Sequence, residues 1–277
     1  MTKIVVLGSD GWLGSNVHRF YGNDSIGLSG SAVRKLLATH SLHNAFLNIP
    51  NMTDETTIIN AIGSRYGDKF RMLESNVKTP HELSEICSTL HLRFIHFGSA
   101  AEYGLNSEKL RISESMDTSP FSEYGKSKLA GSSKVLEYPR SLVLRLFNVV
   151  GPGLQPLNPL TDIRLKVESA LLNSGTIQLH NSFTVRDFIS IDLFLRYLKF
   201  SVDKKLTGIY NVCSGVPVSF GDIALEIARR MGCIEAVESE LSNQIDFVVG
   251  DPTKIRSISG IYEDVDTSAV VDWLLIR

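Results

Sequence analysis

Short apolar runs alternate with amphipathic segments over the first half of this chain. Five runs are typical of buried strands: residues 3–7, 25–28, 43–49, 92–99 and 141–147. The segments between them have the spacing of helices: 15–20, 32–39, 55–65, 76–90 and the segment that holds Tyr124 and Lys128. Strands that alternate with helices are joined by right-handed crossovers, so this order predicts an α/β fold with a doubly wound parallel sheet.

The pattern changes near residue 150. Pro and Gly are frequent in residues 150–158, which indicates a loop that leaves the sheet. Helix-like segments follow at 163–172 and 220–231, and residues 186–200 are expected to return to the sheet. The second half is therefore not expected to continue the regular strand-helix alternation of the first half.

A glycine-rich segment, residues 8–14, directly follows the first predicted strand and precedes a helix-like segment. In that context Gly8 would allow a sharp turn, Gly11 would let the backbone approach a pyrophosphate, and Gly14 would let helix and strand pack closely. The segment thus predicts a dinucleotide site. Its expected cofactor contacts are Gly8, Asp10, Gly11, Trp12, Leu13 and Gly14.

Three further side chains suggest acid-base chemistry. Tyr124 and Lys128 are spaced i,i+4 and would share one face of a helix. A nearby cation would lower the pKa of the phenol toward the range useful for proton transfer. Ser99 ends a predicted strand, at the sheet edge where α/β folds bind ligands. Each motif alone also fits a solvated helix or a turn cap, but their order favours a catalytic site.

Composition narrows the classes of function. The 277 residues are 43% hydrophobic with a formal net charge of -2, which gives no basic field for nucleic acid. No leader and no apolar run long enough for a membrane span is evident. Cys87, Cys213 and Cys233 lack metal-ligand spacing, so we expect buried, reduced thiols, a cytoplasmic protein and no metal site.

With these motifs in this order, the chain resembles the extended short-chain dehydrogenase/reductase family, which contains nucleotide-sugar epimerases, dehydratases and ketoreductases. Other segments that resemble the family are residues 76–79, 144–153, 186–192, 208–212 and 250–254. The resemblance implies a Rossmann-like NAD(P)-binding domain over residues 1–150, to which 186–212 return. It also implies a smaller C-terminal substrate-binding domain, made of residues 151–185 and 213–277.

The resemblance implies roles for individual residues. Tyr124 would be the general acid-base group, Lys128 would lower its pKa and bind the nicotinamide ribose, and Ser99 would hydrogen-bond the reacting oxygen. Asn76 would be structural. Substrate contacts, including Arg186 at the nucleotide diphosphate, are expected from Ala100, Asn148 and Arg186.

Departures from the family pattern narrow the reaction. Ala100 and Ala101 stand where 4,6-dehydratases carry an Asp-Glu pair, and the Cys of the fucose-pathway epimerase-reductases is absent nearby. That leaves an NADPH-dependent 4-ketoreductase of a 4-keto-deoxysugar nucleotide as the leading hypothesis. A nucleotide-sugar 4-epimerase with tightly bound NAD is the alternative, and a non-catalytic redox sensor is a third.

The cofactor preference rests on the end of the second strand. Ser29 and Arg34 have further hydroxyls and cations around them, and such groups suit the 2′-phosphate of NADP. NAD is the alternative cofactor, because Arg34 also fits the solvent-exposed face of a helix. Asn48 and Ile49 stand where we expect the family's cofactor-contacting strand end. The predicted partner is a nucleotide sugar, and the resemblance also permits a homodimer.

Overall fold

The computed structural model describes residues 3–50, 52–104, 109–154, 158–173, 177–179, 182–232, 237–239 and 246–275. The chain divides into two compact units. The first unit comprises Met1–Gly104, Asp117–Leu146 and Tyr197–Tyr210. The second comprises Leu105–Met116, Phe147–Arg196 and Asn211–Arg277. The chain therefore returns to the first unit at Tyr197, later than the residue 186 expected from the sequence.

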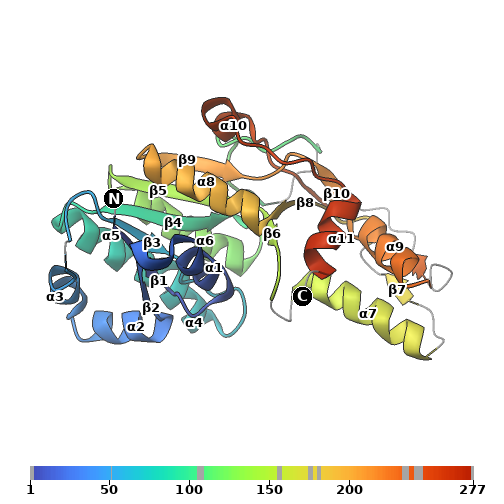
Figure 1. Cartoon of the computed structure of the whole chain (residues 1–277), viewed down its shortest axis with the longest axis horizontal. Helices are drawn as coiled ribbons and strands as arrows, with labels where there is room; N and C mark the ends of the chain where they lie inside the picture. The colour runs from blue at the N-terminus through green and yellow to red at the C-terminus, as the bar shows by residue number, and fades with distance from the viewer. Residues whose placement is uncertain are drawn as a thin grey trace. The chain divides into compact units, whose positions relative to one another are not determined.

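A six-stranded sheet in the order β2-β1-β3-β4-β5-β9 organises the first unit (Figure 1). Its strands are β1 (Ile4–Leu7), β2 (Ser25–Leu28), β3 (Thr57–Asn60), β4 (Arg93–Ser99), β5 (Ser141–Leu146) and β9 (Gly208–Val212). The registers of β1 to β5 are parallel, and the strand order reverses between β1 and β3. Ligands of doubly wound sheets bind at the carboxyl ends of the strands where this reversal occurs. The predicted fold class is confirmed.

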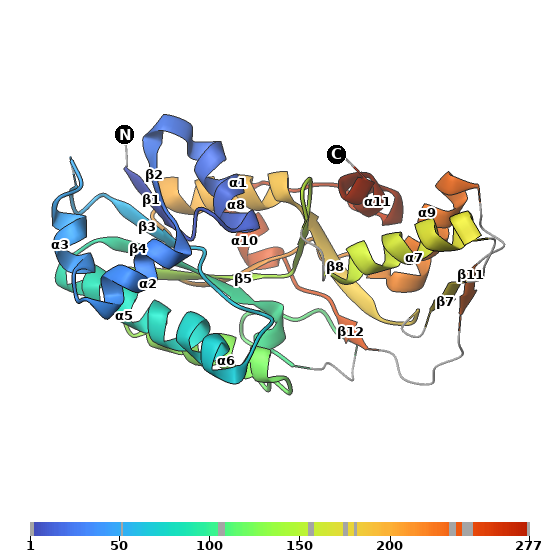
Figure 2. The same cartoon turned by 90° about the horizontal axis from the view of Figure 1, so that it is seen from below.

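Helices cover both faces of this sheet (Figure 2). They are α1 (Trp12–Tyr21), α2 (Gly30–Ala38), α3 (Leu42–Leu47), α4 (Lys69–Leu73), α5 (Thr79–Thr89), α6 (Glu123–Leu136) and α8 (Ile191–Asp203). One face packs against α2, α3, α5 and α6 through buried residues such as Val33, Phe46, Leu83 and Val135. The opposite face carries α1. A π-helical turn, Glu74–Lys78, joins α4 to α5.

Two predicted elements are wrong. Residues 43–49, predicted as a strand, form helix α3, and residues 55–65, predicted as a helix, contain strand β3. The physical reason lies in burial. Leu42 and Phe46 are buried at i,i+4 spacing while Leu47 is 58% exposed, which is a helical pattern. All four residues of β3 are buried between β1 and β4, as in a central parallel strand.

The second unit holds a smaller mixed sheet in the order β10-β8-β12, with β6 paired to β8. Its strands are β6 (Asn148–Val150), β7 (Ile177–Leu179), β8 (Val185–Ser190), β10 (Pro217–Ser219), β11 (Val237–Ser239) and β12 (Phe247–Val248), with β7 and β11 paired separately. Its helices are α7 (Pro159–Asn173), α9 (Phe220–Met231), α10 (Thr253–Ser259) and α11 (Thr267–Leu275). A core that includes Val167, Phe188, Ile227 and Val271 joins α7, α9 and α11 to the sheet.

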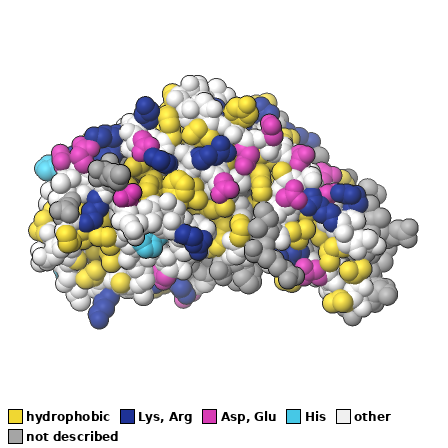
Figure 3. Space-filling model, in the orientation of Figure 1, with side chains coloured by type: hydrophobic (Ala, Val, Ile, Leu, Met, Phe, Trp, Pro, Cys, Tyr) yellow, Lys and Arg dark blue, Asp and Glu magenta, His cyan; other side chains and the backbone are white. Residues whose placement is uncertain are grey.

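Cys87 and Cys213 are buried free thiols, as expected, and Cys233 lies outside the described residues. On the face shown in Figure 3, Lys and Arg are interspersed with Asp and Glu, in keeping with the near-zero net charge. Over the part of the chain that the structure describes, no helix has the length and apolar character to cross a bilayer.

Candidate active site

The glycine loop makes the sharp turn that its sequence predicts. Gly8 has φ of 83°, and a Cβ at Gly14 would lie 2.1 Å from the Gly8 carbonyl oxygen. These two positions therefore require glycine, because any side chain would break the close approach of α1 to β1. Asp10 and Gly11 are exposed, whereas Trp12 and Leu13 are partly buried at the start of α1. No side chain caps this helix, so its first turn is suited to an anion.

The end of β2 gathers the groups expected to read the adenosine ribose. The Asp10 carboxylate accepts a hydrogen bond from the Gly30 amide at 2.7 Å. Ser29 caps α2, and its hydroxyl lies 3.1 Å from that of Ser31. The Arg34 guanidinium also lies here, since a Cβ at Gly30 would be 3.4 Å from its Nη1. Hydroxyls and a guanidinium thus share one small surface with the glycine loop.

Asn48 and Ile49 are not at this edge of the sheet, which corrects the prediction that placed them against the cofactor. They follow helix α3 instead of a strand, and the Asn48 side chain bonds back to the Asn44 carbonyl. Lys3, at the amino end of β1, donates to the Pro50 carbonyl. This turn therefore lies at the opposite edge from Gly8.

Ala61 and Ile62 occupy the place predicted for Asn48 and Ile49. They follow β3, and the Ala61 amide donates to the Leu7 carbonyl at 2.9 Å. A Cβ at Gly8 would lie 3.0 Å from Ile62 Cγ1, so this segment flanks the glycine loop directly. The buried run of residues 57–60 is the signal that identifies it.

The three predicted catalytic side chains come together at the carboxyl end of β4. Ser99 is the last residue of β4; its hydroxyl accepts from the Ala101 amide at 3.2 Å, and its side chain lies close enough to Tyr124 to lower the pKa of the phenol. Tyr124 lies in the first turn of α6, which is capped by Ser122, and Lys128 follows one turn later. Lys128 is 5% exposed, and its Nζ donates to the Phe97 carbonyl at 2.6 Å.

The pKa of Tyr124 is raised, not lowered as expected from Lys128. Burial is the main cause, and the Ser99 side chain and the Arg65 guanidinium act against it. Arg65 Cζ lies 5.9 Å from the centre of the Tyr124 ring. Burial lowers the pKa of Lys128 to about 8, with the Glu102 carboxylate acting in the opposite direction. Arg65 is a site residue that the sequence reasoning missed, since no local motif links it to Tyr124.

A buried histidine lies behind Lys128 and was also missed. His96 is fully buried, with Nε2 3.4 Å from Lys128 Nζ and Nδ1 3.1 Å from Asn60 Nδ2. The Asn60 Oδ1 accepts from the Ile62 amide, so its NH₂ group faces His96 Nδ1. Burial and Lys128 together hold the pKa of His96 well below its usual range.

The Asn76 side chain is fully used in hydrogen bonds within the first unit. It accepts from the Ser64 amide at 2.8 Å and donates to the Ser64 carbonyl at 2.7 Å. It also donates to the Ser127 hydroxyl at 2.9 Å, which ties the loop after β3 to helix α6.

Asn148 and Arg186 belong to the second unit, while Ala100 is buried in the first. Asn148 Nδ2 donates to the Asp187 carbonyl at 2.8 Å. The Arg186 guanidinium is ion-paired with Asp246 and donates to the Val185 carbonyl at 2.9 Å. Arg186 is thus oriented by a carboxylate that a phosphate would have to replace or join.

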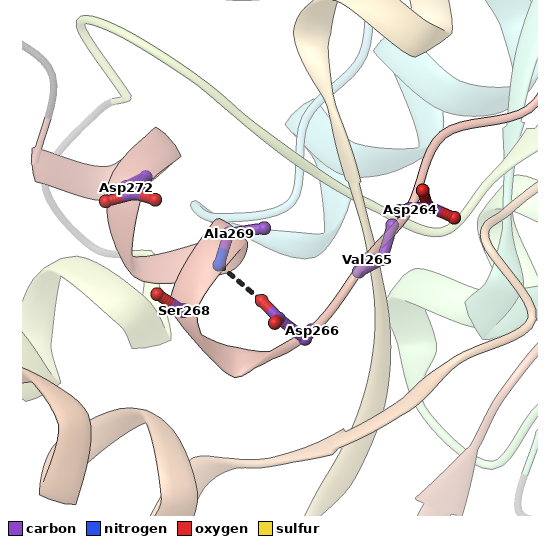
Figure 4. Close-up of a pocket in the computed structure, with 6 residues that line it drawn as sticks. All are labelled: Asp264, Val265, Asp266, Ser268, Ala269 and Asp272. Carbon is purple, nitrogen blue, oxygen red and sulfur yellow. Dashed lines mark hydrogen bonds between the residues drawn. The ribbon is translucent and has the colours of Figure 1, made fainter.

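A pocket in the second unit contains none of the predicted site residues (Figure 4). It is lined by Asp264, Val265, Asp266, Ser268, Ala269 and Asp272. Asp266 caps α11 through the Ala269 amide, and Arg230 binds both Ser268 and Asp272. Helix capping and ion pairing therefore account for the side chains of Asp266, Ser268 and Asp272 in this pocket. No cluster of His, Cys, Asp or Glu suited to a metal occurs among the described residues.

Comparison with known proteins decides the family. The model of the NAD dependent epimerase/dehydratase family matches residues 4–213. The chain belongs to this family. Solved structures agree on the fold: the enzyme RMD from Pseudomonas aeruginosa complexed with NADPH has a TM-score of 0.82 at 20% identity, covering 99% of this chain and 98% of that one. WbmG from Bordetella bronchiseptica in complex with NAD has a TM-score of 0.81 at 22% identity, covering 99% and 92%.

Some curated proteins are more similar to this chain in sequence than these two solved structures are. A dTDP-6-deoxy-L-talose 4-dehydrogenase (NAD(P)(+)) of Kitasatospora kifunensis is 30% identical over 57% of this chain and 54% of the relative. A GDP-6-deoxy-D-talose 4-dehydrogenase of Aggregatibacter actinomycetemcomitans is 32% identical over 59% and 57%. An ADP-L-glycero-D-manno-heptose-6-epimerase of Cupriavidus pinatubonensis is 27% identical over 84% and 79%. The chain thus spans little more than half the length of the two 4-dehydrogenases.

Proposed function

We propose that this chain is an NADPH-dependent 4-ketoreductase that acts on a nucleotide-linked 4-keto-deoxysugar. The placement of Ser99 and Tyr124 side by side at the carboxyl end of β4, one helical turn from buried Lys128, is the observation that carries the proposal. The residues after Ser99 are Ala100 and Ala101, which cannot transfer protons. The chemistry is then limited to one proton transfer coupled to one hydride transfer.

The dinucleotide fits the residues at the end of β1 and β2. The cradle between Gly8 and Gly14 has no room for a side chain, and the first turn of α1 suits a pyrophosphate. Ser29 and Arg34 supply the hydroxyl and the guanidinium that a 2′-phosphate needs. When bound, NADPH supplies a hydride to the carbonyl carbon of the substrate.

Each catalytic side chain then has one task. The Tyr124 hydroxyl donates a proton to the sugar oxygen that gains charge, and the Ser99 hydroxyl donates a second hydrogen bond to the same oxygen. Two donors aimed at one developing oxyanion stabilise the transition state, and removing one such donor costs about 3 kcal/mol. Lys128 holds the nicotinamide ribose, and the Arg65 guanidinium stabilises the phenolate that remains on Tyr124.

The names of two matched relatives support a redox reaction at C4 of a deoxysugar nucleotide. Two of the matched relatives are 4-dehydrogenases of 6-deoxytalose nucleotides, whose reaction in reverse is the reduction of a 4-keto sugar. A nucleotide-sugar 4-epimerase with tightly bound NAD is the second candidate, and an epimerase of another position, the heptose-6-epimerase, matches a larger share of the chain than the 4-dehydrogenases do. The same Ser99, Tyr124 and Lys128 would serve either reaction.

We assign substrate binding to the second unit. Arg186 presents a planar guanidinium that can hold a diphosphate in two contacts, and Asp246 orients it beforehand. We expect Arg186→Gln to raise KM at least about tenfold with a small change in kcat, because a ground-state phosphate contact is lost. A lower kcat with unchanged KM would contradict this assignment.

The function is tested by incubating the purified protein with NADPH and a 4-keto-6-deoxy sugar nucleotide. The expected result is loss of reduced-cofactor absorbance with formation of the 4-hydroxy sugar. Unchanged absorbance over a panel of nucleotide bases would contradict the reductase. Denaturing the protein and identifying any released dinucleotide separates the candidates, since stoichiometric NAD favours the epimerase.

A further inference from the structure

Glu102 is an ionisable residue with 0% exposure, three residues after Ser99 of the proposed site. It ends the short 3₁₀ turn Ala100–Glu102 that follows Ser99. Its Oε1 accepts hydrogen bonds from the Ser99 amide at 2.9 Å and from the Ser132 hydroxyl at 2.8 Å. Its Oε2 accepts from Arg145 Nε at 2.8 Å. A buried carboxylate with this many donors is held in one position.

The surrounding backbone is shaped to admit this carboxylate. A Cβ at Gly98 would lie 2.7 Å from Glu102 Oε1, so a side chain at position 98 would displace it. Arg145 stands opposite Gly98 in the register between β5 and β4. Its guanidinium lies over the ring of Tyr103, with Cζ 4.5 Å from the ring centre. The glycine, the arginine and the aromatic ring together enclose one charge.

The carboxylate connects the two elements that carry the proposed catalytic groups. Tyr124, Lys128 and Ser132 recur at intervals of four residues, so they lie on one face of α6. Glu102 binds the last of the three, and it also binds the amide of Ser99 at the end of β4. The distance between Ser99 and the reactive face of α6 is therefore set through this side chain.

The charge of Glu102 also acts on the site. It raises the pKa of Lys128, and it raises that of Tyr124, so it favours the protonated form of both. The other groups that face Tyr124 are Arg65, Tyr66 and Ser99, and His96 faces Lys128. Among these neighbours of Tyr124 and Lys128 in the described residues, Glu102 is the one with a carboxyl group.

We propose that Glu102, paired with Arg145, is a positioning residue that fixes Ser99 against the Tyr124 and Lys128 face of α6. The proposal rests on the proposed function for its effect on turnover. Its effect on Lys128 is independent of any substrate.

The test measures the titration of Lys128 directly. Protein labelled with ¹³C at the lysine ε-carbon is titrated by NMR, and Lys128→Met assigns the signal. In Glu102→Gln the midpoint is expected to fall by about half a unit to one unit, because a buried negative charge is lost. In Glu102→Asp the charge stays, so the midpoint is expected near that of the wild type, whereas kcat falls about tenfold because the shorter side chain loses an anchor.

Glu123→Gln is the matched control. Glu123 is an exposed carboxylate beside Tyr124 in the sequence, paired with Lys69 and Lys126. Its loss is expected to leave the Lys128 midpoint unchanged. A Glu102→Gln midpoint equal to that of the wild type, or shifted upward, would overturn the proposal.

Glu102→Gln leaves the buried Arg145 without its ion-pair partner and could therefore prevent folding. A second variant keeps the proposal testable in that case. Glu102→Leu combined with Arg145→Met leaves no buried charge, and such replacements are often tolerated. The expected signature is a lowered Lys128 midpoint and reduced kcat. Wild-type values of both in the folded double variant would overturn the proposal. If the wild type turns over no keto sugar, the proposed function fails while the lysine titration still decides the role of Glu102.

Discussion

At the scale of single residues, the proposed reaction depends on one phenol. Replacing Tyr124 with Phe removes the proton donor and keeps the ring, so turnover is expected to fall at least about 100-fold while dinucleotide affinity stays within about twofold. Steady-state kinetics and fluorescence titration with NADPH measure the two quantities. Tyr66→Phe is the control, because Tyr66 also stacks with Arg65 but is exposed. Substantial activity in Tyr124→Phe would exclude Tyr124 as the acid.

Lys128 predicts a particular dependence of stability on pH. Its pKa is lowered to about 8 in the folded protein, so between pH 8 and 10.5 the unfolded state binds more protons and stability rises with pH. Below pH 8 both states are protonated and the burial cost is fully present. Lys128→Met is therefore expected to stabilise the fold by about 2 kcal/mol at pH 7, with a smaller gain near pH 10.

Urea unfolding at the two pH values measures this gain, and exposed Lys126→Met serves as the control. A Lys128→Met variant less stable than the wild type at pH 7 would show that the contact with the Phe97 carbonyl outweighs desolvation.

Arg34 tests the cofactor preference. Arg34→Gln removes the guanidinium beside Gly30 and is expected to raise the Kd for NADPH about tenfold, with little change for NADH. Lys35→Gln, one residue further along the exposed side of α2, should affect neither cofactor as strongly. Equal losses for both dinucleotides would remove the argument for a 2′-phosphate site.

Some site residues were predictable and others were not, for a physical reason. The spacing of Tyr124 and Lys128 and the position of Ser99 at a strand end are local patterns, and the structure brings these three together. Arg65 and His96 meet the site only through contacts across distant parts of the chain. Local periodicity holds no information about such contacts.

At the scale of elements, the same distinction explains the exchanged helix and strand. Residues 43–49 are apolar enough for a short strand, and the burial of Leu42 and Phe46 at helical spacing is the observation that identifies helix α3 instead. Taking this segment as the strand moved the expected cofactor contact from Ala61 and Ile62 to Asn48 and Ile49. One misassigned element thus displaced one side of the predicted cofactor site.

The turn from β1 into α1 allows folding and binding to be separated. Gly14→Ala places a methyl group 2.1 Å from a backbone oxygen and is expected to destabilise the protein by about 3 kcal/mol. Gly11→Ala meets the same oxygen at 3.4 Å, so it should fold normally. Its exposed methyl group should nevertheless weaken dinucleotide binding at least about tenfold. Thermal unfolding and NADPH titration of the two variants test this, and normal binding by Gly11→Ala would contradict the pyrophosphate assignment.

At the scale of the whole molecule, we expect a homodimer through the face that carries α4 and α6. Phe70 and Leu73 on α4 are 78% and 44% exposed, and Phe121 just before α6 is 65% exposed. Apolar side chains gathered this way favour an interface. Light scattering should give twice the chain mass, and Phe70→Glu should give a monomer, whereas Phe20→Glu on α1 should not. A monomeric wild type at high concentration would contradict the expectation.

The π-helical turn between α4 and α5 also limits how the chain can change in length. Each residue advances an α-helix by about 100°. Deleting one residue from Glu74–Lys78 would convert the π-helical turn to α-helix. The side chains that precede the deletion would then be rotated by that angle relative to α5. Asn76 would then point away from Ser64 and Ser127. Loss of one residue from this stretch is therefore expected to harm the protein more than most substitutions there, because Asn76 would lose its hydrogen bond to Ser127 on α6. Deletion scanning of residues 74–78 measures this effect.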